Sequence, residues 1–170
     1  ALSRARAAVD GADIVIANLL FIEEHLAAIL PNLRAARERA DAVLGMVADP
    51  QVVACTRMGD LDMGKPASGA MALLRKLRGG KAPSAGSGEK QMAMLRRLPK
   101  ILRFIPGRAQ DLRAWFLSMQ YWLGGSDDNL EQMVRFLIGR YARRDWGARP
   151  AARPPVDYPQ VGLYHPRLPG

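Results

Sequence analysis

Two carboxylates and an imidazole stand next to one another at Glu23, Glu24 and His25. Carboxylate oxygens and imidazole nitrogens are common ligands of divalent metal ions. Three consecutive helical residues point in different directions, so they cannot converge on one ion unless another segment contributes a ligand. Acidic residues are also favoured in the first turn of a helix, at the positive end of its dipole. The pattern therefore favours the start of a helix over a metal site.

Cys55 is the single cysteine of the chain. A thiolate acts as a nucleophile only when a base lies nearby, and the sequence shows no such partner. A small buried side chain is the better interpretation. A single cysteine also excludes an internal disulfide and suits a reducing cytosol.

The loop from Asp62 to Gly69 holds two glycines, a lysine and a serine, as a phosphate-binding loop does. Its spacing does not match the Walker pattern, and no Gly-rich loop follows the apolar runs near the start of the chain. The sequence contains no nucleophile–base pair, no carboxylate dyad and no Cys/His spacing of a metal site. We therefore predict no catalytic residue and no metal ligand in this chain.

The first 64 residues have the pattern of an α/β layer. Apolar runs at 13–20 and 41–48 have the length and β-branched content of strands covered on both faces. Residues 21–39 between them have apolar side chains at helical spacing, which predicts a βαβ unit with a right-handed crossover. Pro31 is expected to kink or restart that helix, because it cannot donate to the carbonyl of Ala27.

Residues 4–9 have the pattern of a helix end, so we expect the tail of an α/β layer whose earlier strands lie outside this chain. In open α/β sheets, ligands tend to bind beyond the carboxyl ends of the strands. The polar residues expected at that edge are Asn18, Glu23, Glu24, His25 and Asp49.

The net charge of +9 is distributed unevenly. Residues 1–64 hold six basic and nine acidic side chains, residues 65–113 hold twelve and two, and residues 114–170 hold seven and five. The basic middle could steer an anionic partner such as nucleic acid or a lipid surface, and a solvated helix face explains it equally well. No apolar run approaches the roughly 20 residues of a membrane-spanning helix, and no signal peptide is visible.

The composition of the middle of the chain predicts a boundary between the α/β layer and a helical portion. Residues 65–90 should form a basic helix and then a flexible linker, "GGKAPSAGSGEK" at 79–90. Helical spacing resumes at 92–104 with a basic opposite face, and it opens a mainly helical portion at 91–146. The division is thus an α/β layer at 1–64, a linker region, a helical portion, and a last segment at 147–170.

The helical portion should contain an αα-hairpin. Apolar side chains recur at helical spacing, first at Leu112, Trp115, Phe116, Met119, Trp122 and Leu123, and then at Leu130, Met133, Val134, Leu137 and Tyr141. Gly124 and Gly125 should end the first helix, and Ser126 should cap the second. Two helices with so short a link should pack against each other. Aromatic residues at such spacing usually belong to a core.

The last segment, 147–170, predicts a proline-rich connecting loop and then a strand at Val161–Tyr164. His165 follows the end of that strand, so it is the better of the two histidines as a functional candidate. A single histidine is a weak indication of a metal or proton role.

Five stretches resemble one protein family. They are "ADIVIANLLFIEEHLAAILP" (12–31), "DMGKPASGAMALLRKLRG" (62–79), "LRRLPKILRFIPG" (95–107), "AWFLSMQYWLGGSDDNLEQMVRFLIGRY" (114–141) and "YPQVGLYHPR" (158–167). In order and in content they are similar to the N-terminal part of the large porphyrin-binding H subunit of magnesium chelatase, which is related to the large subunit of cobaltochelatase. Members are several-fold longer than this chain, so the resemblance implies an excised piece.

The resemblance implies that the whole protein inserts Mg²⁺ into protoporphyrin IX in chlorophyll or bacteriochlorophyll synthesis. Both are substrates, and ATP is used by a partner subunit. The implied partners are the ATPase subunit, the bridging subunit and the remaining domains of the same polypeptide, in the cytoplasm or the plastid stroma. Porphyrins bind against aromatic walls with arginines on their propionates, so the porphyrin contacts to test are Trp122, Arg108, Arg113 and His165.

An alternative interpretation of the residues alone is a basic helical binding module, without enzymatic activity, for nucleic acid or an acidic protein. It predicts salt-dependent nucleic-acid binding. No helix-turn-helix, zinc-finger or RNA-binding motif is visible, so no nucleic-acid partner is expected.

Overall fold

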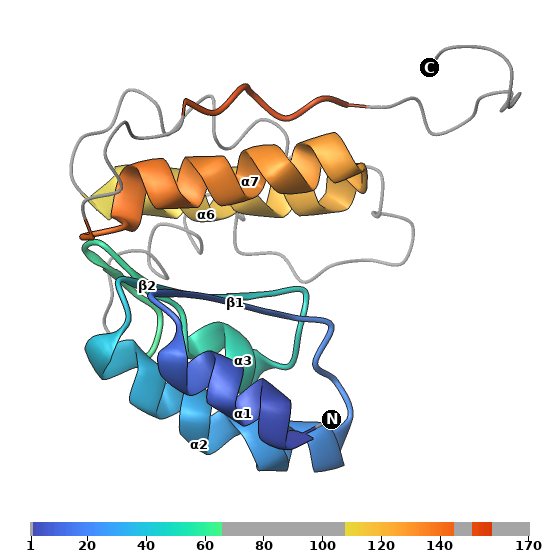
Figure 1. Ribbon diagram of the computed structural model, residues 1–170, viewed down its shortest axis with the longest axis vertical. Helices are drawn as coiled ribbons and strands as arrows, with labels where there is room; N and C mark the ends of the chain where they lie inside the picture. The colour runs from blue at the N-terminus through green and yellow to red at the C-terminus, as the bar shows by residue number, and fades with distance from the viewer. Residues whose placement is uncertain (1, 66–107, 145–150, 158–170) are drawn as a thin grey trace, which may run out of the picture.

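The computed structural model describes residues 2–65, 108–144 and 151–157 (Figure 1). The basic helix and linker predicted between the two larger ranges, the helix of 92–104, the strand at 161–164 and His165 all lie outside the described residues.

A parallel βαβ unit begins the fold, as predicted. Strand β1 spans Ile14–Asn18, helix α2 spans Glu23–Arg39, and strand β2 spans Ala42–Met46. The two strands pair in parallel along their whole length. A short helix, α1 at Leu2–Gly11, precedes β1. Every residue of β2 is buried, which is the burial expected of a strand with helices on both faces.

Pro31 was expected to kink or restart the helix, and the restart was wrong, because α2 is a single helix that contains Pro31. Pro31 and Ala27 are both exposed, so water can take the place of the donor that proline removes. The opposite side of the helix is held against the sheet by buried apolar side chains: Leu26, Ile29, Leu30, Leu33 and Ala36.

Helix α3 (Pro50–Ala54) begins directly after Asp49, which is its N-cap residue. The carboxylate of Asp49 accepts a hydrogen bond from the backbone N–H of Gln51 at 2.8 Å. Proline occupies the first helical position, where its missing N–H costs nothing.

A β-hairpin that the sequence analysis missed extends the sheet. Strands β3 (Arg57–Met58) and β4 (Leu61–Asp62) pair antiparallel, and β3 pairs antiparallel with β2. Two-residue strands are too short to show a periodicity. The turn uses Gly59 at φ +56, a left-handed conformation that suits glycine. The sheet is therefore mixed, in the order β1-β2-β3-β4, rather than wholly parallel.

The predicted αα-hairpin is present. Helix α6 spans Arg108–Gly124 and α7 spans Asp127–Tyr141. Gly125 turns the chain at φ +66, and the hydroxyl of Ser126 accepts a hydrogen bond from Asn129 N at 3.1 Å. Two residues of the predicted apolar faces are largely exposed, namely Leu123 and Val134.

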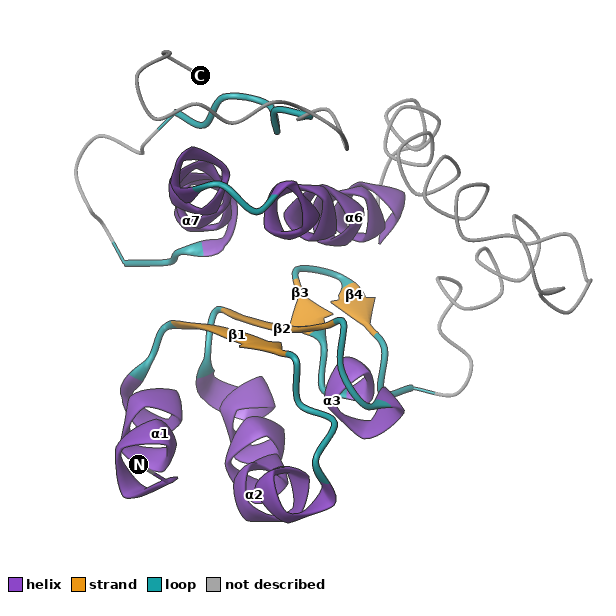
Figure 2. Ribbon diagram, turned by 90° about the vertical axis from the view of Figure 1, so that its right-hand side faces the viewer, coloured by secondary structure: helices purple, strands orange, loops and turns teal. Residues whose placement is uncertain are grey.

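The sheet lies between two layers of helices (Figures 1 and 2). Helices α1, α2 and α3 cover one face, and the α6–α7 hairpin covers the other. One core lies between the sheet and the hairpin and includes Leu44, Met46, Met58, Leu61, Leu112, Trp115, Phe116 and Leu137. The second lies under α2 and includes Val15, Val43, Leu33, Val52 and Cys55. The predicted division at residues 65–90 stays a prediction, although the described residues on either side of it share the first core.

Gly45 of β2 contacts elements on both faces of the sheet, α6 on one and α3 on the other. Its carbonyl accepts a hydrogen bond from Trp115 Nε1 of α6 at 3.1 Å. Its N–H donates to Thr56 Oγ1 at 2.9 Å. A Cβ at this position would lie 2.2 Å from the carbonyl oxygen of Val52. The strand therefore has room for glycine alone where α3 crosses it.

Candidate functional site

The carboxyl edge of the parallel strands carries the residues with metal-binding chemistry, and they do not converge. Glu23, Glu24 and His25 are all exposed in the first turn of α2. Among the residues that the structure describes, no group of three or more His, Cys, Asp or Glu side chains could hold a metal ion. Glu23, Glu24 and His25 are the first three residues of α2, as the sequence pattern favours.

The loops at the same edge are strained and apolar. Leu19 has φ +56 and Val47 has φ +43, conformations that cost side chains with a Cβ about 1–3 kcal/mol. The two residues are joined by a hydrogen bond from Leu19 N to Val47 O at 3.0 Å. Leu19, Phe21 and Ile22 are each 60% exposed, so the loop after β1 presents three large apolar side chains to solvent.

Cys55 is a buried structural residue. It is 2% exposed, and its Sγ donates to the carbonyl of Gln51 at 3.3 Å. Burial raises the pKa of the Cys55 thiol, and the positive charges of Arg37 and Arg34 only partly oppose this. The thiolate is disfavoured, which agrees with the interpretation as a small buried side chain.

Two of the four candidate porphyrin contacts, Trp122 and Arg113, have described side chains, and these lie on different sides of α6. Trp122 and Arg113 are both partly buried on α6, and Trp122 packs against the core under the hairpin. An α-helix turns about 100° per residue, so side chains nine residues apart leave on roughly opposite sides. Arg108 is the first residue of α6, about 21 Å along the axis from Trp122. His165 lies outside the described residues.

Most of the aromatic cluster belongs to the core. Trp115, Phe116 and Tyr121 are at most 8% exposed. Trp115 and Phe116 meet edge to face, with ring centroids 5.0 Å apart. Burial raises the pKa of Tyr121, against the effect of the nearby positive charge of Arg113. Trp115 joins the hairpin to the sheet through its bond to Gly45, and none of the three rings is free to stack on a ligand.

A buried carboxylate that the sequence analysis did not single out joins the hairpin to the β3–β4 turn. Asp111 of α6 is 8% exposed and accepts three hydrogen bonds. The donors are Asp60 N at 2.9 Å, Tyr141 Oη at 2.8 Å and Arg140 Nη2 at 3.2 Å. Burial raises the pKa of Tyr141 well above the ordinary tyrosine value, so its hydroxyl remains a donor. Three donors around one carboxylate make this a structural junction.

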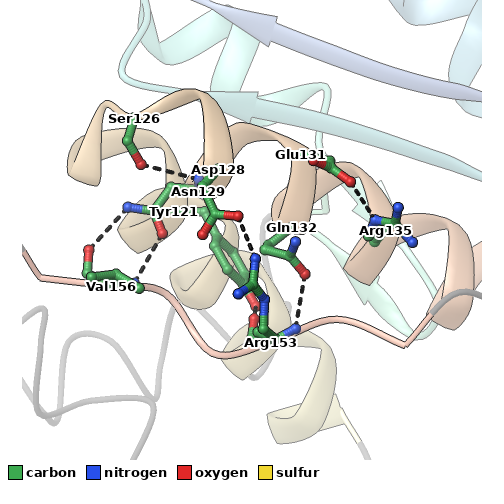
Figure 3. Close-up of polar contacts among 9 residues, drawn as sticks. All are labelled: Tyr121, Ser126, Asp128, Asn129, Glu131, Gln132, Arg135, Arg153 and Val156. Atoms are coloured by element: carbon green, nitrogen blue, oxygen red, sulfur yellow. Dashed lines mark hydrogen bonds and ion pairs between the residues drawn. The ribbon is translucent and has the colours of Figure 1, made fainter. Parts of the chain in front are cut away.

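A second polar cluster holds the extended segment 151–157 on the hairpin (Figure 3). The side-chain amide of Asn129 donates to Val156 O and accepts from Val156 N, both at 2.9 Å. Gln132 Oε1 accepts from Arg153 N at 3.0 Å. The hydroxyl of Tyr121 donates to Arg153 O, and the Arg153 guanidinium pairs with Asp128. Side chains of α6 and α7 therefore satisfy the backbone N–H and C=O groups of Arg153 and Val156, in a segment that pairs with no strand that the structure describes.

Asn129→Ala is expected to release this segment and to lower the free energy of unfolding by about 2 kcal/mol, because two hydrogen bonds of a buried amide are lost. Amide hydrogen exchange can locate the effect. Val156 N–H should exchange faster in Asn129→Ala, while Arg153 N–H keeps its bond to Gln132. Gln132→Ala should give the opposite pattern. Unchanged exchange of Val156 in the first variant would contradict the assignment.

None of the helices that the structure describes is long and apolar enough to cross a bilayer.

Residues 1–116 match the family described as "Domain of unknown function (DUF3479)". The matched region includes the whole sheet and the first half of α6.

Comparison with curated proteins finds relatives along nearly the whole chain. The magnesium-chelatase H subunit of Rhodobacter capsulatus is 69% identical over 99% of this chain and 14% of its own length. The protein of the same name from Cereibacter sphaeroides is 68% identical over the same shares. The chloroplastic magnesium-chelatase ChlH subunit of Oryza sativa subsp. indica is 32% identical over 93% of this chain and 11% of its own length. The chain spans about one seventh of the length of the first two relatives.

Proposed function

Because the chain belongs to the DUF3479 family and corresponds to a segment of magnesium-chelatase H subunits, we propose that it is part of a porphyrin-binding chelatase subunit. The whole protein then inserts Mg²⁺ into protoporphyrin IX, and both are its substrates. The observation that carries the proposal is 69% identity over 99% of the chain. Identity at this level along the whole fold is far more specific than a short motif.

Within that protein, the role we assign to this segment is structural and partner-facing. The polar clusters at Asp111 and Asn129 serve the packing of the chain on itself, and the exposed apolar loop at Leu19–Ile22 offers a contact surface. Metal insertion on this proposal takes place mostly on residues outside this chain. ATP is used by a separate ATPase subunit, and a third subunit bridges the two, in the cytoplasm or the plastid stroma.

A chimeric protein tests the proposal. The chain is placed in the H subunit of Rhodobacter capsulatus in exchange for the matching segment, and Mg²⁺ insertion is measured with that organism's partner subunits. We expect insertion within a fewfold of the natural rate. The same chimera with Asp111→Asn is the matched control and should lose stability. A folded chimera that binds its partners but inserts no Mg²⁺ would overturn the proposal.

Direct porphyrin contact is a separate question, and tryptophan fluorescence can answer it. If the C-terminal end of α6 touches the pigment, Trp122→Ala in the chimeric protein is expected to weaken saturable binding of a soluble protoporphyrin analogue severalfold. Arg113→Ala tests a propionate contact, and Arg135→Ala, an exposed arginine of α7 paired with Glu131, is the charge-matched control. Unchanged affinity in both test variants would place the pigment elsewhere. Tight, salt-sensitive binding of nucleic acid would instead favour the alternative of a basic binding module.

A further inference from the structure

The outer edge of β1 pairs with no strand in the part of the chain that the structure describes. In the sheet order β1-β2-β3-β4, β1 stands at one end, and among the described residues it pairs with β2 alone. Its sequence, Ile-Val-Ile-Ala-Asn, contains no charge and no proline. Natural edge strands are usually blunted by lysine, proline or a bulge, because an open row of N–H and C=O groups pairs with other chains. This composition is that of an interior strand.

The hydrogen bonds at both ends of β1 show which backbone groups face outward. Asp13 O accepts from Asp41 N at 2.7 Å, and Leu19 N donates to Val47 O at 3.0 Å, so both residues face β2. Backbone direction alternates along a strand, so the odd-numbered residues between them also face β2. The even-numbered residues direct their N–H and C=O groups to the outer edge: Ile14, Ile16 and Asn18.

Both faces of β1 are already covered as in an interior strand. Val15 and Ala17 are buried in the core under α2, and Ile14 and Ile16 pack against the core under the α6–α7 hairpin. Helix α1, in contrast, has no buried residue. It is held beside α2 by polar contacts, among them Arg6 Nη2 to Ala28 O at 2.9 Å. Val9 of α1 is partly buried against the core under α2, and the other residues of the helix are exposed. A helix of an α/β layer that packs against so little of the sheet is expected where the strand beneath it comes from another part of the polypeptide.

The handedness of βαβ units fixes where that strand lies. Helices α1 and α2 lie side by side on the same face of the sheet (Figures 1 and 2). Right-handed crossovers with helices on one face advance across the sheet in one direction, and nearly all crossovers are right-handed. Since α2 leads from β1 to β2, a strand that enters through α1 lies on the other side of β1, in parallel.

We propose that the outer edge of β1 binds a parallel β-strand from the polypeptide that precedes this segment in the longer protein, with α1 as its crossover helix. This segment spans 14% of the length of two relatives, so the longer protein contains polypeptide outside it. The inference depends on the segment being embedded in a longer polypeptide and not on any porphyrin chemistry. The strand proposal can fail while the chelatase proposal holds, and the chelatase proposal can fail while the strand proposal holds.

Residue-resolved hydrogen exchange in the intact longer protein tests the pairing. The amides of Ile14, Ile16 and Asn18 are expected to exchange roughly a hundredfold or more slowly than unpaired amides, as the amides of Val15 and Ala17 do. Fast exchange at the even-numbered residues beside slow exchange at the odd-numbered ones would overturn the proposal. If the slow exchange of these amides disappears when the protein is diluted, the edge pairs with a second copy of the protein. That result would also overturn the proposal.

A truncated protein that begins at Ala1 identifies the source of the strand. In it, the even-numbered amides should exchange fast while the odd-numbered ones stay slow. Even-numbered amides that remain slow would mean that the strand comes from later in the polypeptide, contrary to the proposal.

If the truncated protein does not form the sheet, a pair of variants in the intact protein tests the pairing of β1 instead. Proline is tolerated where a strand N–H faces solvent and not where it pairs. Ile16→Pro should therefore speed exchange at Ile14 and Asn18 at least tenfold more than Ile16→Ala, which removes the same side chain. Equal rates in the two variants would overturn the proposal.

Discussion

Gly45→Ala is expected to lower the free energy of unfolding by about 3 kcal/mol or more, or to prevent folding. The added Cβ would meet three backbone atoms of α3: Val52 O at 2.2 Å, Val52 C at 2.6 Å and Val53 Cα at 2.9 Å. Backbone atoms cannot rotate away as a side chain does, so α3 or β2 must shift. That shift would also disturb the hydrogen bond from Trp115 to Gly45 O.

Urea unfolding followed by circular dichroism measures this effect. Gly11→Ala is the matched control, because a Cβ at the end of α1 meets nothing within 4 Å. That control should be neutral or slightly stabilising, since alanine restricts the unfolded chain. A Gly45→Ala variant that unfolds at the wild-type midpoint would show that α3 can move away from β2 at little cost.

Asp111→Asn is expected to destabilise the chain by about 3 kcal/mol, because it breaks a buried charged network without changing its shape. All three groups that face Asp111 are donors: Asp60 N, Tyr141 Oη and Arg140 Nη2. An asparagine side chain presents an NH₂ group to at least one of them. The loss should also free the β3–β4 turn, since Asp60 N has its bond to this carboxylate.

The matched control is Glu131→Gln on α7. Glu131 pairs with Arg135 four residues later at 2.7 Å, and both side chains are about half exposed. Such surface pairs contribute only about 0.3–0.5 kcal/mol. For a chain of this size, the Asp111 variant should melt roughly 6–12 °C lower and the control within about 2 °C of the wild type. Equal melting temperatures would show that water replaces the lost acceptor.

The βαβ unit and the αα-hairpin could be predicted because their patterns are local. Apolar runs of strand length and helical spacing are visible within 10–20 residues, and so are the Ser126 cap and the glycine stop at Gly125. The β3–β4 hairpin could not be predicted, because two-residue strands leave no periodicity. The predicted restart of the helix at Pro31 was wrong because Pro31 lies on the exposed side of α2, and the sequence alone does not show which side of the helix faces the sheet.

The polar clusters were missed for a different reason. Asp111 lies in the first turn of α6, where a carboxylate is ordinary, and its partner Asp60 N lies 51 residues away. Asn129 lies three residues after the predicted cap Ser126, and a polar residue is ordinary in the first turn of a helix. Only the fold brings Val156 to it, across 27 residues. The candidate porphyrin contacts rest on the family resemblance, and nothing in the described geometry takes the place of a binding measurement.

The shared core under the α6–α7 hairpin has a consequence during translation. Leu44, Met46, Met58 and Leu61 line the face of the sheet toward the hairpin, and the helices that cover them come from much later in the chain. The contact between Gly45 and Trp115 spans 70 residues. At ribosomal rates of about 5–20 residues per second, that face stays bare for roughly 4–14 s after the strands emerge. A nascent chain of this kind presents an apolar surface to chaperones near the exit tunnel until Trp115 of α6 has been made.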